Sequence, residues 1–327
     1  MTHEELNSKI AFLFDGETVA SLTMYFVLKK EGEVANTVKK VGIADEARDS
    51  LFEQFKTSID EKLHSNQDVF IADISKVDEK TNAVYYYDLD EKVTGLGVLS
   101  EVLTNPPTEE FDFGRDKLKD IFAIVFVLGN ETKKLAIYKK QSPINILRRR
   151  TVLSRVTRLV PTDSHLEELQ KDVVEISSGF DFLQTGDDVL VLNLATLEKY
   201  FGFHEVIKGI ATETIRLIGD LNFVADTGSI DKFLSDPSMS RRIMRMRRDS
   251  PVLDLDFVTV RTFIKGHDKL KGLFKFNEDE SRIVLKSKAS VTRFIKLLDD
   301  DYLTSQLTKI DYDAERKEIL AATDEDN

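Results

Sequence analysis

Cysteine is absent from the 327 residues of this chain. Disulfide bonds, thiolate metal sites and cysteine nucleophiles are therefore excluded, and the composition suits the reducing cytoplasm. Long apolar runs are also missing, because the longest covers only residues 121–128. A membrane-spanning helix needs about 20 apolar residues, so we expect none. The N-terminus has no basic region followed by an apolar core, and we expect no secretory signal.

Sequence motifs of the common catalytic sites are missing as well. The chain has no Gly-x-x-x-x-Gly-Lys phosphate-binding loop and no Gly-x-Ser-x-Gly elbow. Its histidines are scattered as His3, His64, His165, His204 and His267. Acidic pairs occur at residues 88–90 and 254–256, but 58 acidic residues produce such pairs by chance, and the second pair fits a helix N-terminus. We therefore identify no catalytic residues, expect no cofactor or metal, and predict that the protein is not an enzyme.

Charge is distributed unevenly along the chain. Residues 1–120 hold 14 basic and 25 acidic residues, whereas residues 121–327 hold 32 and 33. Within the second part, residues 132–160 contain nine basic residues and no acidic one. Concentrated positive charge attracts polyanions, of which phosphate backbones are the commonest. This segment indicates nucleic-acid contact, although a strand edge protected by lysines explains it equally well.

The apolar pattern of the first part predicts a small α/β domain. Short segments rich in aromatic and β-branched residues at 22–29, 68–74 and 83–87 predict three strands. At residues 43–63 apolar residues recur with the 3.6-residue period of a helix. Consecutive prolines at 106 and 107, followed by acidic residues, indicate a linker over residues 104–118. The predicted fold class is α+β with two domains, an acidic N-terminal domain of residues 1–117 and a C-terminal domain of residues 118–327.

The second domain is expected to contain a small sheet followed mostly by helices. Residues 121–128 and 133–139 form a predicted β-hairpin with Gly129-Asn130 in the turn. We expect the first of these strands to be buried on both faces and the second to present its lysines outward. Further short strands are predicted at residues 173–176, 180–184 and 189–192. A helical pattern follows, interrupted by a hairpin whose turn is residues 277–280.

A second basic element lies within this helical part. At 100° per residue, four arginines occupy one side of a predicted helix and Met239, Ile243 and Met246 the other. The four are Arg241, Arg242, Arg245 and Arg248. Ser238 or Ser240 is the expected cap. Phosphate binding is one interpretation of the arginine row. Pairing with acidic residues of a neighbouring domain or subunit is another, and contact with an anionic membrane a third.

The order helix, hairpin, helix over residues 255–298 loosely resembles a winged helix-turn-helix. Basic residues continue into its last part, which also suits a polyanion. They are Lys286, Lys288, Arg293 and Lys296.

One block of sequence resembles a known family. It reads Gly179-Phe180-Asp181-Phe182-Leu183, then Gly186-Asp187-Asp188-Val189-Leu190-Val191-Leu192-Asn193, Leu197-Glu198 and Phe201-Gly202-Phe203. This order is similar to that of the KwaB family of the Kiwa anti-phage defence system, over roughly residues 120–310. The block itself is expected to be structural, with Phe180 and Phe182 buried and Asp187-Asp188 in a turn.

The resemblance implies a cytoplasmic, DNA-binding homodimer. It also implies a membrane-embedded KwaA-like partner, action at the inner membrane, and inhibition of the replication and transcription of phage DNA. The family offers no motif that assigns a DNA contact to a single residue. From charge, the expected contacts are Arg148, Arg149, Arg150, Arg155, Arg158, Arg241, Arg242, Arg245, Arg248, Lys286 and Lys288.

Three hypotheses follow. The first is a non-enzymatic DNA-binding protein with mainly backbone contacts. The second is a metal-dependent nuclease whose ligands converge only in the fold. The third is an interaction protein whose basic surface docks on an acidic partner. The acidic first domain is the candidate for contacting the membrane partner or a second subunit.

Overall fold

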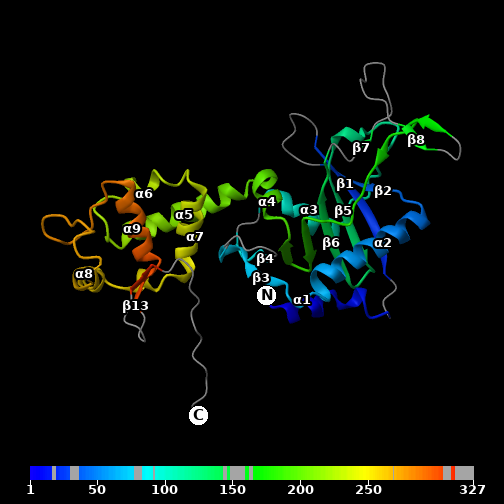
Figure 1. The fold of residues 1–327 in the computed structure, drawn as a ribbon. Helices are drawn as coiled ribbons and strands as arrows, with labels where there is room; N and C mark the ends of the chain where they lie inside the picture. Colours follow the sequence, from blue (N-terminus) through cyan, green and yellow to red (C-terminus); the bar gives the residue numbers. More distant parts are fainter. Residues whose placement is uncertain are drawn as a thin grey trace, which may run out of the picture. The chain divides into compact units, whose positions relative to one another are not determined.

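The computed structural model describes residues 1–16, 20–29, 37–76, 83–90, 93–142, 146–147, 159–161, 165–267, 269–304 and 311–313. The chain divides into two compact units, Met1–Gly202 and Phe203–Asn327 (Figure 1). Each unit has its own apolar core.

The first unit is built on an eight-stranded sheet in the order β2-β1-β5-β6-β11-β12-β4-β3. Neighbouring strands are antiparallel except β3 and β4, which are parallel. The strands are β1 (Ser21–Leu28), β2 (Thr37–Val41), β3 (Phe70–Asp73), β4 (Ala83–Tyr86), β5 (Ile121–Gly129), β6 (Lys134–Lys140), β11 (Phe182–Thr185) and β12 (Asp188–Val191). Two small ribbons pair β7 (Ile146–Leu147) with β10 (Val173–Val174) and β8 (Leu159–Pro161) with β9 (Leu166–Glu168).

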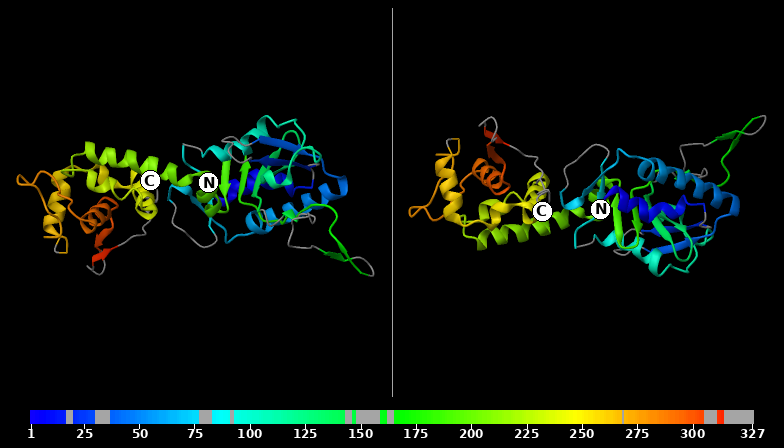
Figure 2. Two further views of the ribbon diagram at one scale, coloured as in Figure 1. Left: turned by 90° about the horizontal axis from the view of Figure 1, so that it is seen from above. Right: turned by 90° about the horizontal axis from the view of Figure 1, so that it is seen from below.

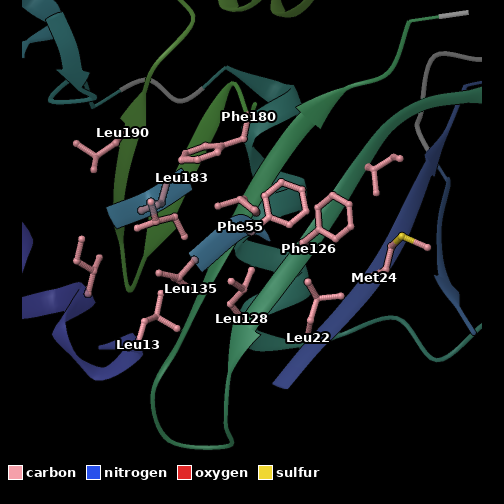
Figure 3. Packing of buried hydrophobic residues seen from close by; sticks show 14 of the residues in the cluster. Leu13, Leu22, Met24, Phe55, Phe126, Leu128, Leu135, Phe180, Leu183 and Leu190 are labelled. Carbon is pink, nitrogen blue, oxygen red and sulfur yellow. The ribbon is translucent and has the colours of Figure 1, made fainter. Parts of the chain in front are cut away.

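Helices cover both faces of this sheet. They are α1 (His3–Ile10), α2 (Asp45–Ile59), which continues into a π-helical turn (Asp60–His64), α3 (Gly97–Thr104) and α4 (Leu194–Phe201). Short 3-10 turns lie at Ala11–Leu13, Ile74–Lys76, Thr94–Leu96 and Leu118–Asp120. α1 and α2 pack on one face, where Phe55 lies 4.4 Å from Phe126 between ring centroids (Figure 3).

The other face carries Tyr138 and Phe182, against which Phe201 of α4 packs. A Cβ on Gly95 would lie 2.0 Å from Cδ1 of the Phe201 ring, so only glycine leaves room for that ring. On the same face, Ser100 of α3 bonds to Gln184 of β11. Because both faces are covered, β5 is apolar on both sides and almost wholly buried, as predicted.

The lysines of β6 do not all point outward as predicted. Lys139 is buried, and its ammonium donates hydrogen bonds to Ser177 Oγ (2.7 Å) and the Gly179 carbonyl (2.6 Å). Burial lowers the pKa of Lys139. The prediction was wrong for this residue because β6 is an inner strand, flanked by β5 and β11, rather than an edge.

The α+β fold class is confirmed, but the sheet crosses the predicted boundary between residues 117 and 118. β1 pairs with β5 over its whole length, with Tyr25 opposite Val125. The division into units falls after Gly202 instead. The predicted linker belongs to the first unit, where Phe111 is buried. Lys39 of β2 bonds there to Glu109 and Asp116, and these bonds raise its pKa.

The second unit is mainly helical. Its elements are α5 (Phe203–Asp220), α6 (Gly228–Asp231), α7 (Pro237–Asp249), a 3-10 turn (Pro251–Asp254), α8 (Phe257–Gly266), α9 (Lys288–Leu298) and the ribbon of β13 (Tyr302–Thr304) with β14 (Asp311–Asp313). α5 is the long helix that runs beside α7 (Figure 2). Gly202, with φ of 68°, separates α4 from α5, so the long helical pattern of the sequence is two helices.

The predicted hairpin between α8 and α9 is present in reduced form. One antiparallel bridge joins Phe276 to Ile283, and Ile283 also bridges to Val224 in parallel. The backbone NH of Val284 donates to the Lys275 carbonyl at 2.7 Å. The predicted order of helix, hairpin and helix is therefore present as α8, the bridge between Phe276 and Ile283, and α9.

Candidate nucleic-acid interface

Of the first predicted basic element, residues 132–160, the four lysines lie on β6 and in the turn before it. Its five arginines lie outside the described residues, which stop at β7 and resume at β8. They are Arg148, Arg149, Arg150, Arg155 and Arg158. Their contribution to an interface stays a prediction.

The second basic element is α7, as predicted, and its apolar side is confirmed. Ile243 and Met246 are fully buried in the core of the second unit. Asp236, not Ser238 or Ser240, caps the helix, because its carboxylate accepts hydrogen bonds from the backbone NH of Ser238 at 3.1 Å. Ser240 is buried, and its hydroxyl donates to the Leu234 carbonyl.

The arginines of α7 do not form the outward row that the helical wheel indicates. The Arg242 guanidinium bonds to Asp299 (Nε to Oδ2, 3.2 Å) and to Asp301. Arg245 bonds to the same Asp299 oxygen at 3.3 Å. The Arg242 side chain is 15% exposed and that of Asp301 is 0% exposed. The expectation that these guanidinium groups face solvent was therefore wrong.

The physical reason is the packing of α9. Asp299 is the C-cap of α9, and Asp301 follows it by two residues. The end of this helix lies against α7 and supplies the carboxylates that buried guanidinium groups require. The alternative in which the arginines pair with acidic residues is observed, but inside their own unit rather than with a neighbouring domain or subunit. Arg241 is half-buried, and the side chain of Arg248 lies outside the described part.

Lys286 and Lys288, both predicted DNA contacts, are exposed. Lys286 follows the hairpin. Lys288 begins α9, whose N-cap is Ser287. The Lys288 ammonium lies 4.0 Å from an Asp236 carboxylate oxygen and 5.7 Å from the Phe233 ring centroid. A contact at this distance between exposed groups contributes little and leaves the lysine available to a ligand.

A further lysine of the hairpin was missed by the sequence reasoning. Lys275 is exposed between the half-buried Phe276 and the buried Phe274. In an antiparallel hairpin, residues two apart share a face, so the register of Phe276 opposite Ile283 puts Lys275 and Lys286 on the same outward face. The alternation of apolar residues 274 and 276 around Lys275 was the signal that could have identified it.

The tip of this hairpin is acidic. Glu280 bonds through its carboxylate to Lys265 and through its carbonyl to Arg261 at 3.0 Å. Asp279 accepts a hydrogen bond from Ser281 at 2.7 Å. The tip therefore disfavours phosphate, and the positive surface lies along the outward face. We call Lys275, Lys286 and Lys288 the hairpin lysines.

The residues that carry the family resemblance are structural in the first unit. Phe180 and Phe182 are buried, and residues 185–188 form the turn between β11 and β12, as predicted. Gly186 adopts a left-handed φ of 57° in that turn. The Asp181 carboxylate is buried and accepts three hydrogen bonds, from Asn193 Nδ2, Thr196 Oγ1 and the Lys140 backbone NH.

Two further features bear on the other hypotheses. In the described ranges, no group of three or more His, Asp or Glu side chains is placed to hold a metal ion. No helix that the structure describes combines the length and the apolar character needed to cross a membrane.

Comparisons with known proteins point to one family. Residues 118–308 match the family model described as Kiwa protein KwaB-like. The chain is also similar to the Kiwa protein KwaB of Escherichia coli O55:H7 (strain RM12579 / EPEC), with 27% identity over 323 residues. That similarity covers 98% of this chain and 99% of the relative. No solved structure matches the chain.

Proposed function

We propose a function for this chain from one premise: it belongs to the Kiwa protein KwaB-like family, which implies a Kiwa anti-phage defence protein. The proposal is that the chain binds DNA, largely through phosphate contacts, and so hinders replication and transcription of phage DNA. It acts as a non-enzymatic protein, as a homodimer, and together with a membrane-embedded KwaA-like partner that holds it at the inner membrane from the cytoplasmic side. The family match supports the defence role and the partner.

The observation that supports DNA contact in the described part is the outward face of the second unit's hairpin. Lys275 and Lys286 share this face, and Lys288 follows at the start of α9. Ammonium groups that are exposed on one surface can each neutralise a phosphate and release its counterion. This arrangement favours contacts with the backbone over reading of base edges.

The first test replaces Lys275 and Lys286 with Glu. Duplex binding by the wild-type protein should weaken steeply with salt, and the double variant should bind at least about tenfold more weakly. Its log–log salt slope should fall by about 0.9 for each phosphate that the variant no longer neutralises. Fluorescence anisotropy with a labelled duplex at several salt concentrations measures both quantities.

The matched control is a pair of substitutions, Lys208→Glu and Arg216→Glu, which makes the same change of four charge units at two exposed positions of α5. Equal weakening in the control and the double variant would indicate a general charge effect and contradict the proposed surface. Arg242 and Arg245 are unsuitable for this test, because a Glu at either position would face Asp299 and unfold the unit.

The nuclease hypothesis is tested in the same preparation. Labelled DNA incubated with the protein and Mg²⁺ or Mn²⁺ should stay intact under the proposal. Nuclease activity that co-elutes with the wild-type protein in size-exclusion chromatography would overturn the non-enzymatic assignment.

A further inference from the structure

A second positively charged cluster lies in the first unit, at the sheet edge where β1 and β6 end and β5 begins. Lys29 follows β1, Phe122 is near the start of β5, and Lys140 ends β6. β1, β5 and β6 are antiparallel neighbours, so these positions meet at one edge. α4 adds Lys199 and Tyr200. We call these five residues the lysine–aromatic cluster.

The three ammonium groups surround two adjoining rings. Lys140 Nζ lies 4.0 Å from the Phe122 centroid and 4.9 Å from that of Tyr200. Lys29 Nζ lies 5.3 Å from the Phe122 centroid, and Lys199 Nζ lies 5.2 Å from that of Tyr200. The rings are 6.0 Å apart and nearly perpendicular. All four distances are within the range of cation–π attraction.

Aromatic faces attract these cations but do not neutralise them. Among the residues that the structure describes, no carboxylate forms an ion pair with Lys29, Lys140 or Lys199. The Lys140 ammonium donates to the Gln141 carbonyl at 2.8 Å. Burial lowers the pKa of Lys140, and the charges of Lys29 and Lys199 lower it further against the opposing effect of Asp181. Three like charges held this way favour an anion between them.

The exposed ring identifies the class of anion. Tyr200 is 42% exposed, so a ligand can reach this residue from solvent. Ammonium groups next to an exposed aromatic ring are the chemistry with which proteins hold unpaired nucleotides: the cations bind phosphate and the ring stacks on a base. We infer that the lysine–aromatic cluster binds a nucleoside phosphate, with the phosphate among the three lysines and the base on Tyr200.

Two sources present this chemistry, a free nucleotide and an unpaired nucleotide in a nucleic-acid strand. The inference does not rest on the DNA contact proposed for the hairpin lysines, because all five residues lie in the other unit. A carboxylate-rich peptide would satisfy the lysines but has no group for the Tyr200 ring, so it is not favoured.

Isothermal titration calorimetry on the full-length protein tests the inference with three probes: ATP, an oligothymidylate of eight nucleotides, and inorganic phosphate. We expect ATP or the oligonucleotide to bind, and phosphate to bind more than tenfold more weakly than the better of the two. The probe that binds more tightly identifies the source. Absence of binding by both nucleotide probes, or equal binding of phosphate, would overturn the inference.

Four variants locate the site. Lys29→Gln and Lys199→Gln should each weaken nucleotide binding about tenfold, the usual value of one charge-assisted hydrogen bond. Both lysines are exposed, so these variants should keep the fold, which circular dichroism checks. Tyr200→Leu should weaken nucleotide binding and leave phosphate binding unchanged. The control is Lys133→Gln, an exposed lysine in the turn at the other end of the β5–β6 hairpin.

Unchanged affinity in Lys29→Gln, Lys199→Gln and Tyr200→Leu, or an equal decrease in the Lys133→Gln control, would place the binding elsewhere and overturn the inference. Its failure is distinguishable from failure of the proposed function. The hairpin double variant should bind ATP normally, and Lys29→Gln with Lys199→Gln should retain duplex DNA.

Discussion

At the scale of single residues, Asp181 ties three elements of the first unit together. Its carboxylate accepts hydrogen bonds from Asn193 Nδ2 at 2.7 Å, Thr196 Oγ1 at 3.0 Å and the Lys140 backbone NH at 2.7 Å. Asn193 is itself the N-cap of α4. One buried carboxylate therefore fixes the end of β6 to the start of α4, which carries Tyr200. The position of the lysine–aromatic cluster depends on this residue.

We predict that Asp181→Asn lowers the free energy of unfolding by about 2 kcal/mol, a value within the range that one hydrogen bond to a charged group contributes. The amide keeps the shape but turns an NH₂ toward groups that donate, so at least one hydrogen bond is broken. Urea denaturation followed by circular dichroism measures the change. Asp187→Asn, in the exposed turn before β12, is the control and should stay within about 0.5 kcal/mol of wild type. Equal stability of the two variants would contradict this role of Asp181.

At the scale of elements, α7 and α9 are joined by charge as well as by apolar packing. Arg242 and Arg245 share Asp299, and Arg242 also contacts Asp301. Buried ion pairs add little net stability when complete, because desolvation of both partners offsets their attraction. Removal of one partner is costly, because it leaves an uncompensated charge inside the unit.

We predict that Arg242→Ala destabilises the second unit by about 3 to 5 kcal/mol. The reason is that Asp301, fully buried, would lose the guanidinium that it contacts. The double variant Arg242→Gln with Asp301→Asn should recover much of this stability, since both charges are then absent. Thermal and urea unfolding measure the series.

Arg216→Ala is the control for this series, as an exposed arginine on α5 that should change stability by less than about 0.5 kcal/mol. If Arg242→Ala were as stable as this control, the ion pairs would not hold α7 to α9.

Most strands of the large sheet, together with α2 and α7, were predicted from sequence, but α1, α3 and β2 were not. The partners of the predicted elements could not be predicted. The 3.6-residue period identified α7 and placed Ile243 and Met246 in the core, because the spacing of residues along a helix alone determines which of them share a face. It could not identify Asp299, more than fifty residues further along, as the partner of Arg242. The wrong prediction for Lys139 has the same cause. The lysines of β6 are typical of an edge strand, and the sequence did not show that β11 pairs with β6.

At the scale of the whole molecule, long-range strand pairing decides the division of the chain. Composition and the two prolines indicated a boundary near residue 117, but β5 lies beside β1. Nothing local in either strand specifies that pairing, because antiparallel partners can be separated by any length of chain. The candidate DNA surface and the lysine–aromatic cluster consequently belong to different units. The predicted boundary had instead placed Lys29 in the first domain and the other four cluster residues in the second, together with the hairpin lysines.

The two units have separate cores, so we predict that they unfold as separate cooperative transitions. Differential scanning calorimetry of the full-length protein should then resolve two components. Asp181→Asn should lower the midpoint of one by on the order of 5 °C, and Arg242→Ala should lower only the other. If each substitution instead shifted one common transition, the cores would be thermodynamically coupled. A ligand at either surface would then stabilise the whole chain, whereas independent transitions confine the effect of ATP to the first unit and of duplex DNA to the second.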